Sequence, residues 1–153
     1  MTAEGMMAKT GMVAKTGYSG TPLPKKLGLK EGGTLVIVHA PAHNGDWLSP
    51  LPDASRLSAK LAASNDLVLL FCRDAATLKK SLPRVSKKLN ADGSLWISWP
   101  KKTSKLFVDL TEDGIRAIVL PTGLVDVKVC AVNEDWSGLK LMVRKELRDK
   151  WNK

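Results

Sequence analysis

Two short apolar runs decide the fold class: TLVIVH at residues 34–39 and DLVLLFC at residues 66–72. Both are almost continuously hydrophobic, without the alternation expected of a strand that has one face in water. Such runs are typical of strands covered on both faces, as in a parallel sheet with helices packed against it. They are also far shorter than the roughly 20 apolar residues that a membrane-spanning helix needs.

A basic helix is predicted directly after the second run. Asp74 is suited to cap its first turn, and the apolar positions then recur at spacings of four, three and four. These positions are Leu78, Leu82, Val85 and Leu89. We expect Pro83 to kink or restart the helix, because proline removes a backbone donor and clashes with the preceding turn. Residues 90–93 (NADG) are expected to close the helix, with Gly93 in a left-handed turn.

The rest of the chain adds a third buried strand, a second helix and a closing strand pair. The predicted strands are residues 94–99, 124–132 and 139–144, and the predicted helix runs from 111 to 119. Residues 55–63 fit either a strand or a helix, and we favour an extended segment. This order specifies an α/β fold: a mainly parallel, Rossmann-like sheet with a C-terminal antiparallel strand pair.

One domain is predicted, over residues 18–145, and it includes an ordered N-terminal arm at residues 20–29. Prolines in the arm oppose an ordinary helix interior, while its leucines can be buried. Residues 1–17 are interpreted as a flexible tail, since MMAKTG is followed by MVAKTG with no apolar face; alternatively, translation starts at a later methionine. Residues 146–153 are expected to form a basic, frayed C-terminal tail, although Trp151 could dock on the domain.

The positive charge is concentrated in one part of the chain. The 153 residues carry a net charge of +9, and residues 79–105 hold eight basic residues against the single acid Asp92. Such a surface attracts phosphates or an acidic partner, although a solvated basic face is the ordinary interpretation. Nucleic-acid binding is therefore possible but not favoured, because one Tyr and two Phe give little sign of a base-stacking platform.

The order of elements over residues 33–145 resembles the later half of the class I S-adenosylmethionine-dependent methyltransferase fold. Several phrases also resemble a small bacterial family known only as a domain of unknown function. They are GYSGTPL at 17–23, WPKK at 99–102, DLTED at 109–113, VDVKVCAV at 125–132 and WSGLK at 136–140. The resemblance implies a methyltransferase-like fold but no established activity, and it supplies no catalytic residues.

A methyltransferase of this fold needs a glycine-rich turn after its first strand and an acidic side chain after the next. Here the first strand is followed by HAPAHNGD at residues 39–46, which contains only Gly45. We therefore expect no bound cofactor. The two cysteines, Cys72 and Cys130, fall within predicted strands and are interpreted as small core residues, and no spacing of histidine and cysteine predicts a metal site.

The candidate binding site is the crevice at the carboxyl ends of the strands, where α/β sheets usually present ligands. Its candidate residues are His39, His43, Arg73, Trp99, Lys101 and Lys102. Trp136, in a predicted turn, either folds back on the sheet or forms an exposed anchor for a partner, and we favour packing.

The leading hypothesis is a noncatalytic, methyltransferase-like binding or regulatory domain that engages a protein or a small anionic ligand. One alternative is a small enzyme, either a degenerate methyltransferase or one using acid/base chemistry at His39, His43 or Asp46 with Lys101 or Lys102. The other is nucleic-acid binding through the basic surface of residues 79–105. With no membrane segment and few cysteines, the chain is expected to act in the cytoplasm; its oligomeric state is not predicted.

Overall fold

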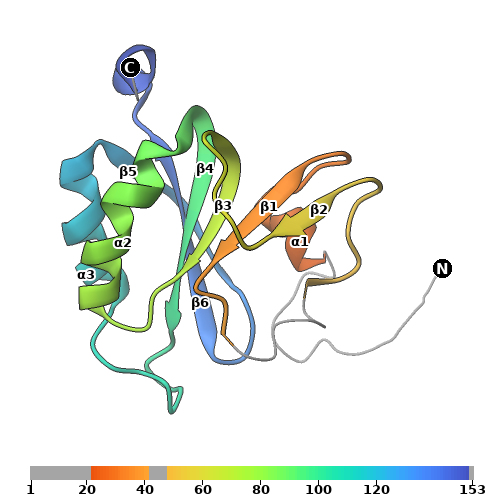
Figure 1. Cartoon of the computed structure of the whole chain (residues 1–153). Coiled ribbons are helices and arrows are strands. Elements are labelled where there is room, and N and C mark those ends of the chain that lie inside the picture. Colours follow the sequence, from red (N-terminus) through yellow and green to blue (C-terminus); the bar gives the residue numbers. More distant parts are fainter. Residues whose placement is uncertain (1–21, 42–47, 152–153) are drawn as a thin grey trace.

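Six strands form one sheet in the computed structural model, which describes residues 22–41 and 48–151 (Figure 1). The strands are β1 (Thr34–Val38), β2 (Arg56–Ser58), β3 (Asn65–Phe71), β4 (Leu89–Pro100), β5 (Leu124–Ala131) and β6 (Trp136–Val143). Their order across the sheet is β2-β1-β3-β4-β6-β5. The predicted flexible tail, the first residues of the arm and His43 lie outside the described residues.

The sheet is parallel over its first four strands. β1 pairs in parallel with both β2 and β3, and β3 pairs in parallel with β4. β6 is antiparallel to β4 on one side and to β5 on the other. The predicted mainly parallel sheet with a C-terminal antiparallel strand pair is therefore confirmed.

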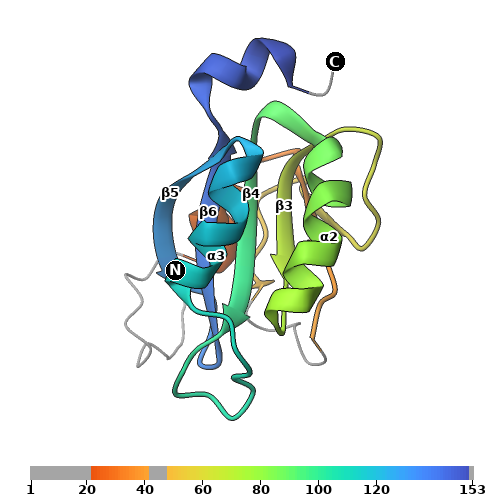
Figure 2. The ribbon, with the colours of Figure 1, turned by 90° about the vertical axis from the view of Figure 1, so that its left-hand side faces the viewer.

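Each face of the sheet has its own apolar core. Helices α2 (Ala75–Lys87) and α3 (Glu112–Val119) cover one face, and the short helix α1 (Leu23–Leu27) lies on the other (Figures 1 and 2). Within β1, Val36 and Val38 belong to the core under α2 and α3, whereas Leu35 and Ile37 belong to the core on the α1 side. This two-sided burial explains the continuous hydrophobic runs. None of the helices in the described residues has the length and apolar character needed to cross a membrane.

The N-terminal arm contains a helical turn that its prolines do not prevent. Pro22 is the N-cap of α1 and Pro24 lies in its first turn, where no intrahelical partner is needed for the missing N–H. Leu23 and Leu27 are buried on the sheet. The described part of the arm, from residue 22, therefore packs on the domain as a short helix rather than as a purely extended segment.

The junction between α2 and β4 differs from the prediction. α2 runs through Pro83 as one helix, and β4 already begins at Leu89, so residues 90–93 belong to the strand. The buried Asn65 side chain closes this junction, because its amide donates to the carbonyls of Ala62 (3.0 Å) and Lys88 (2.8 Å). Gly93 does not have the positive φ of the predicted left-handed turn. Glycine is required there because it has no side chain: a Cβ would lie 3.0 Å from the Asp66 carbonyl oxygen.

Two other predicted segments are confirmed. The second helix, α3, begins where expected, because the Thr111 hydroxyl accepts a hydrogen bond from the Gly114 N–H at 3.0 Å. Arg116 then joins α3 to β5 through a 3.0 Å ion pair with Asp126. In the segment 55–63, the favoured extended structure is present over β2, which is only three residues long and forms one edge of the sheet.

The predicted C-terminal tail is helical in its described part. Residues Lys145–Lys150 form the 3-10 helix η3, and Trp151 donates its indole N–H to the Leu89 carbonyl at 3.0 Å. Leu147 and Trp151 pack against the core beneath α2 and α3. The expectation of a frayed tail is therefore wrong for residues 146–151, and the alternative, docking of Trp151, is confirmed. Apolar contacts of Leu147 and Trp151 hold the segment in spite of its many charged residues.

Gly123 provides the space for this docking, and its replacement tests the contact. Its φ is +100°, and a Cβ there would lie 2.8 Å from Leu147 Cδ1 and 3.3 Å from Trp151 Cζ3. We expect Gly123→Ala to lower the free energy of unfolding by about 1–3 kcal/mol, measured by urea denaturation, through backbone strain and displacement of η3. Gly28→Ala is the matched control, because Gly28 has φ +104° with nothing within 4 Å of a Cβ. Equal losses in the two variants would contradict a steric role for Gly123.

Candidate functional site

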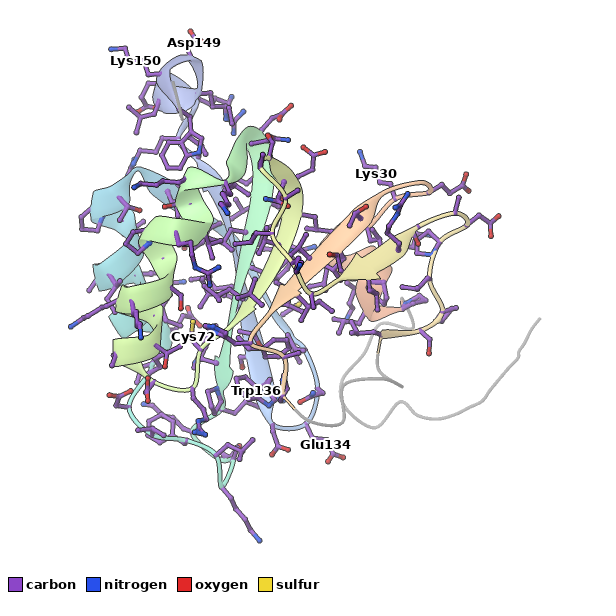
Figure 3. The ribbon with its side chains drawn as sticks, in the orientation of Figure 1. Lys30, Cys72, Glu134, Trp136, Asp149 and Lys150 are labelled. Atoms are coloured by element: carbon purple, nitrogen blue, oxygen red, sulfur yellow. The ribbon has the colours of Figure 1, made fainter. Side chains whose placement is uncertain are left out.

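A pocket of about 540 Å³ opens at the carboxyl ends of β1 and β3. From β1 the chain continues to β2 on one side and then to β3 on the other, so the strand order reverses direction at this point. In open α/β sheets ligands bind in the crevice at such a reversal. Cys72 and Trp136 mark this end of the sheet in Figure 3.

The β1 side of the pocket is formed by His39, Ala40 and Pro41. His39 is exposed and has φ +59°, a left-handed conformation that non-glycine residues adopt at a cost of about 1 kcal/mol or more. Strained backbone of this kind is concentrated at functional sites. His39 therefore supplies an imidazole at the rim, while Pro41 offers no backbone N–H to a ligand.

The floor of the pocket is aromatic. Phe71, the last residue of β3, and Trp136, the first residue of β6, both line it and are 1% and 6% exposed. Their rings meet edge to face with centroids 5.0 Å apart and an interplanar angle of 86°. This geometry is favourable for aromatic pairs and holds the two rings in fixed positions at the bottom of the pocket. Trp136 therefore packs on the sheet, as favoured from the sequence.

Arg73 supplies the positive charge of the pocket. It is exposed and lines the pocket together with Thr77 in the first turn of α2. The neighbouring Asp74 is occupied as the cap of α2, where its carboxylate accepts the Thr77 N–H at 2.8 Å. Hydrogen bonds from Thr77, with a smaller effect of Arg73, lower the pKa of Asp74. Arg73 has no ion pair with any other residue that the structure describes.

The loop after β4 contributes an apolar residue instead of the predicted lysines. Leu106 lines the pocket and is 42% exposed, whereas Lys101 and Lys102 are absent from the described lining. The Lys101 N–H donates to the Asp135 carbonyl at 2.8 Å, which directs this loop toward the β5–β6 turn. Leu106 was not among the predicted site residues, although in the sequence it stands out as an apolar residue directly after the polar stretch KKTSK at 101–105.

The remaining predicted site residues do not join this pocket. Trp99 is 6% exposed and packs in the core beneath α2 and α3, so its indole is not a surface group. His43 lies outside the described residues. Of the predicted set, the structure therefore brings together His39, Arg73 and Trp136, and it adds Phe71, Thr77 and Leu106. No group of histidine, cysteine and acidic side chains suited to a metal ion occurs among residues 22–41 and 48–151.

Comparison with known proteins relates this geometry to a family and a fold. Residues 53–145 match the family described as "Protein of unknown function (DUF3052)". No curated protein sequence matches the chain significantly. Solved structures with a similar fold include a SAM dependent methyltransferase from Aquifex aeolicus, with TM-score 0.51 and 14% identity over 78% of this chain and 87% of that one. Another is ribosomal protein L11 methylase from Lactobacillus delbrueckii subsp. bulgaricus, with TM-score 0.50 and 13% identity over 80% and 75% of the chains.

These structural similarities show a methyltransferase-like fold, and the pocket can be tested for its fit to S-adenosylmethionine. A residue with a Cβ and an imidazole, His39, stands where backbone must approach the cofactor, and Pro41 removes a donor. Residues 59–64, which lead from β2 to β3, include no carboxylate that could hold the ribose hydroxyls. The described residues do not fit this cofactor.

Proposed function

The chain belongs to the family described as "Protein of unknown function (DUF3052)", and from its strand-end pocket we propose a noncatalytic domain that binds a small anionic ligand. The observation that carries this proposal is Arg73 at the rim above the edge-to-face pair of Phe71 and Trp136. A guanidinium is suited to carboxylate or phosphate, and an aromatic floor is suited to a flat apolar group. The proposed ligand therefore combines both features.

A binding role is supported further by the chemistry of the lining. Among the described lining residues, His39 is the only side chain suited to general acid/base catalysis, and no carboxylate in that lining orients it. Asp74 is engaged in capping α2, and Cys72 is fully buried in the core beneath α2 and α3. The pocket offers groups that hold and orient an anion, which is the basis for preferring binding to catalysis.

The cytoplasm remains the proposed location. Cys72 and Cys130 are both free thiols, as is usual in a reducing compartment.

Titration of the full chain with phenyl phosphate, followed by NMR of backbone amides, tests the proposal. We expect shifts in residues 71–77 and at the Trp136 indole N–H, with much weaker effects from neutral phenol or from inorganic phosphate alone. Arg73→Gln should weaken phenyl phosphate binding about tenfold, because it removes a charge-assisted hydrogen bond at little cost in stability.

Lys102→Gln is the matched control, since Lys102 is an exposed cation near this end of the sheet but outside the described lining. It should leave the affinity within about twofold of the original, as expected for an exposed, solvent-screened charge that does not line the pocket. Equal losses in the Arg73 and Lys102 variants, or shifts centred on the basic face of α2, would argue against the pocket.

A further inference from the structure

A second basic surface runs along helix α2, from the turn after the strand-end pocket to the opposite end of the sheet. Helix α2 and its C-cap carry five basic residues and no acid over residues 75–88. Of these, Lys79, Lys80, Arg84 and Lys87 are exposed and Lys88 is half-buried. The helix dipole places about half a negative charge at the C-terminal end of a helix, which by itself repels anions. The five positive charges of this surface outweigh that effect. This face of the molecule therefore attracts polyanions.

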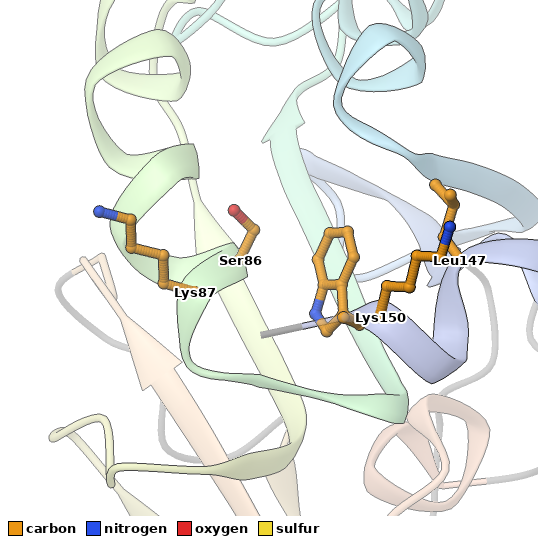
Figure 4. Close-up of a pocket in the computed structure, with 5 residues that line it drawn as sticks. Ser86, Lys87, Leu147 and Lys150 are labelled. Carbon is orange, nitrogen blue, oxygen red and sulfur yellow. The ribbon is translucent and has the colours of Figure 1, made fainter. Parts of the chain in front are cut away.

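The basic surface contains a groove of about 310 Å³ between the last turn of α2 and η3. It is lined by Ser86, Lys87, Leu147, Lys150 and Trp151. Figure 4 shows Lys87 extending from α2 on one side of the groove and Lys150 lying along η3 on the other. The acids of η3, Glu146 and Asp149, are exposed and absent from the described lining. The groove thus has a cation on each side.

The indole of Trp151 is held in place within this groove. Its N–H donates to the Leu89 carbonyl at 3.0 Å, and its Cζ3 lies 3.3 Å from the position of a Cβ on Gly123. The side chain is nevertheless only half-buried and lines the groove. A fixed, partly exposed aromatic ring between cations is a suitable stacking platform, because little conformational entropy is lost when a flat ring packs on it.

We propose that this groove binds single-stranded nucleic acid, with a base stacked on Trp151 and the flanking phosphates paired with Lys87 and Lys150. The strand would continue along the exposed cations of α2. An acidic peptide could pair with the lysines but would leave the indole without a flat partner. The combination of two lysines with an indole therefore favours nucleic acid over an acidic peptide. The site is separate from the strand-end pocket: Lys150 and Trp136 lie at opposite ends of the sheet in Figure 3.

Fluorescence anisotropy with a labelled oligothymidylate and an abasic strand of the same length tests this inference on the full chain. A merely electrostatic surface binds both strands alike, whereas stacking favours the strand with bases. We expect the protein to bind the oligothymidylate at least about fivefold more tightly than the abasic strand. Trp151→Ala should abolish this preference, with a loss of about tenfold for the oligothymidylate.

Charge variants test the phosphate contacts. The double variant Lys87→Gln, Lys150→Gln should weaken binding of both strands about tenfold and reduce the slope of log affinity against log salt by about 1–2. Lys60→Gln and Lys105→Gln, exposed lysines outside the described lining of the groove, are the matched controls and should change affinity less than twofold.

Folding must be checked because the Trp151 indole also bonds to Leu89. Circular dichroism of each variant does so, and Trp151→Phe, which keeps an aromatic face, should retain part of the preference for bases if the fold is intact. The inference is overturned if neither strand binds in 50 mM salt, if both bind equally, or if the control lysines matter as much as Lys87 and Lys150. These outcomes do not depend on the strand-end pocket, so failure of phenyl phosphate to bind at Arg73 would leave them unchanged.

Discussion

Trp96→Ala should lower the free energy of unfolding by about 3–5 kcal/mol, a large part of the 5–15 kcal/mol typical of a domain. Trp96 is fully buried in the core on the α1 side. Its indole N–H donates to the Leu27 carbonyl at 2.9 Å, so one side chain joins the central strand β4 to the arm. A Cβ on Gly138 would lie 3.3 Å from the Trp96 indole, so the neighbouring strand β6 packs closely against this ring. Urea denaturation followed by circular dichroism measures the loss.

Two further variants separate packing from hydrogen bonding. Trp96→Phe keeps most of the apolar volume but removes the donor to Leu27, and it should cost about 1–3 kcal/mol. Leu57→Ala, at a side chain that is 40% exposed, should change stability by about 0.5 kcal/mol or less. If Trp96→Phe unfolds at the same urea concentration as the original chain, the bond to Leu27 does not stabilise the arm.

The main architecture could be predicted because strands that are buried on both faces have continuous apolar sequences. The runs at 34–39 and 66–72 became β1 and β3, and the Asp74 cap began α2 as expected. The errors arose where long-range contacts decided the local structure. The Asn65 amide donates to the Lys88 carbonyl, a contact across 23 positions that no local pattern contains, and β4 begins at the next residue, Leu89.

The sequence predicted residues of the site only where it also predicted the end of a strand. His39 and Arg73 follow two neighbouring parallel strands, and the structure brings them to one pocket. Trp99 was assigned there as well, but its burial depends on the register of β4. Phe71 lies opposite Ser98, so the next residue, Trp99, points to the other face of the sheet. A shift of one residue reverses the face of every side chain, and the sequence does not specify that register.

The distinction between binding and catalysis can be tested at Cys72, the buried thiol between Phe71 and Arg73. Burial, reinforced by the negative charge of Asp74, raises the pKa of the Cys72 thiol from 9.0 to about 12. Because each pKa unit is a factor of ten, the thiolate fraction near neutral pH falls about a thousandfold. We therefore expect iodoacetamide at pH 8 to modify Cys72 about a thousandfold more slowly in the folded chain than in guanidinium, measured by mass spectrometry.

Cys130 provides an internal control in the same experiment. It is half-buried, and although burial also raises its pKa, Lys26 and Lys128 oppose that effect, so Cys130 should react faster than Cys72 in the folded chain. Since the thiolate is the nucleophilic form, a protonated Cys72 cannot serve as a catalytic nucleophile at the pocket. Rapid modification of Cys72 in the folded protein would instead reveal a reactive thiolate beside Arg73 and would favour the enzyme hypothesis over the binding domain proposed for this pocket.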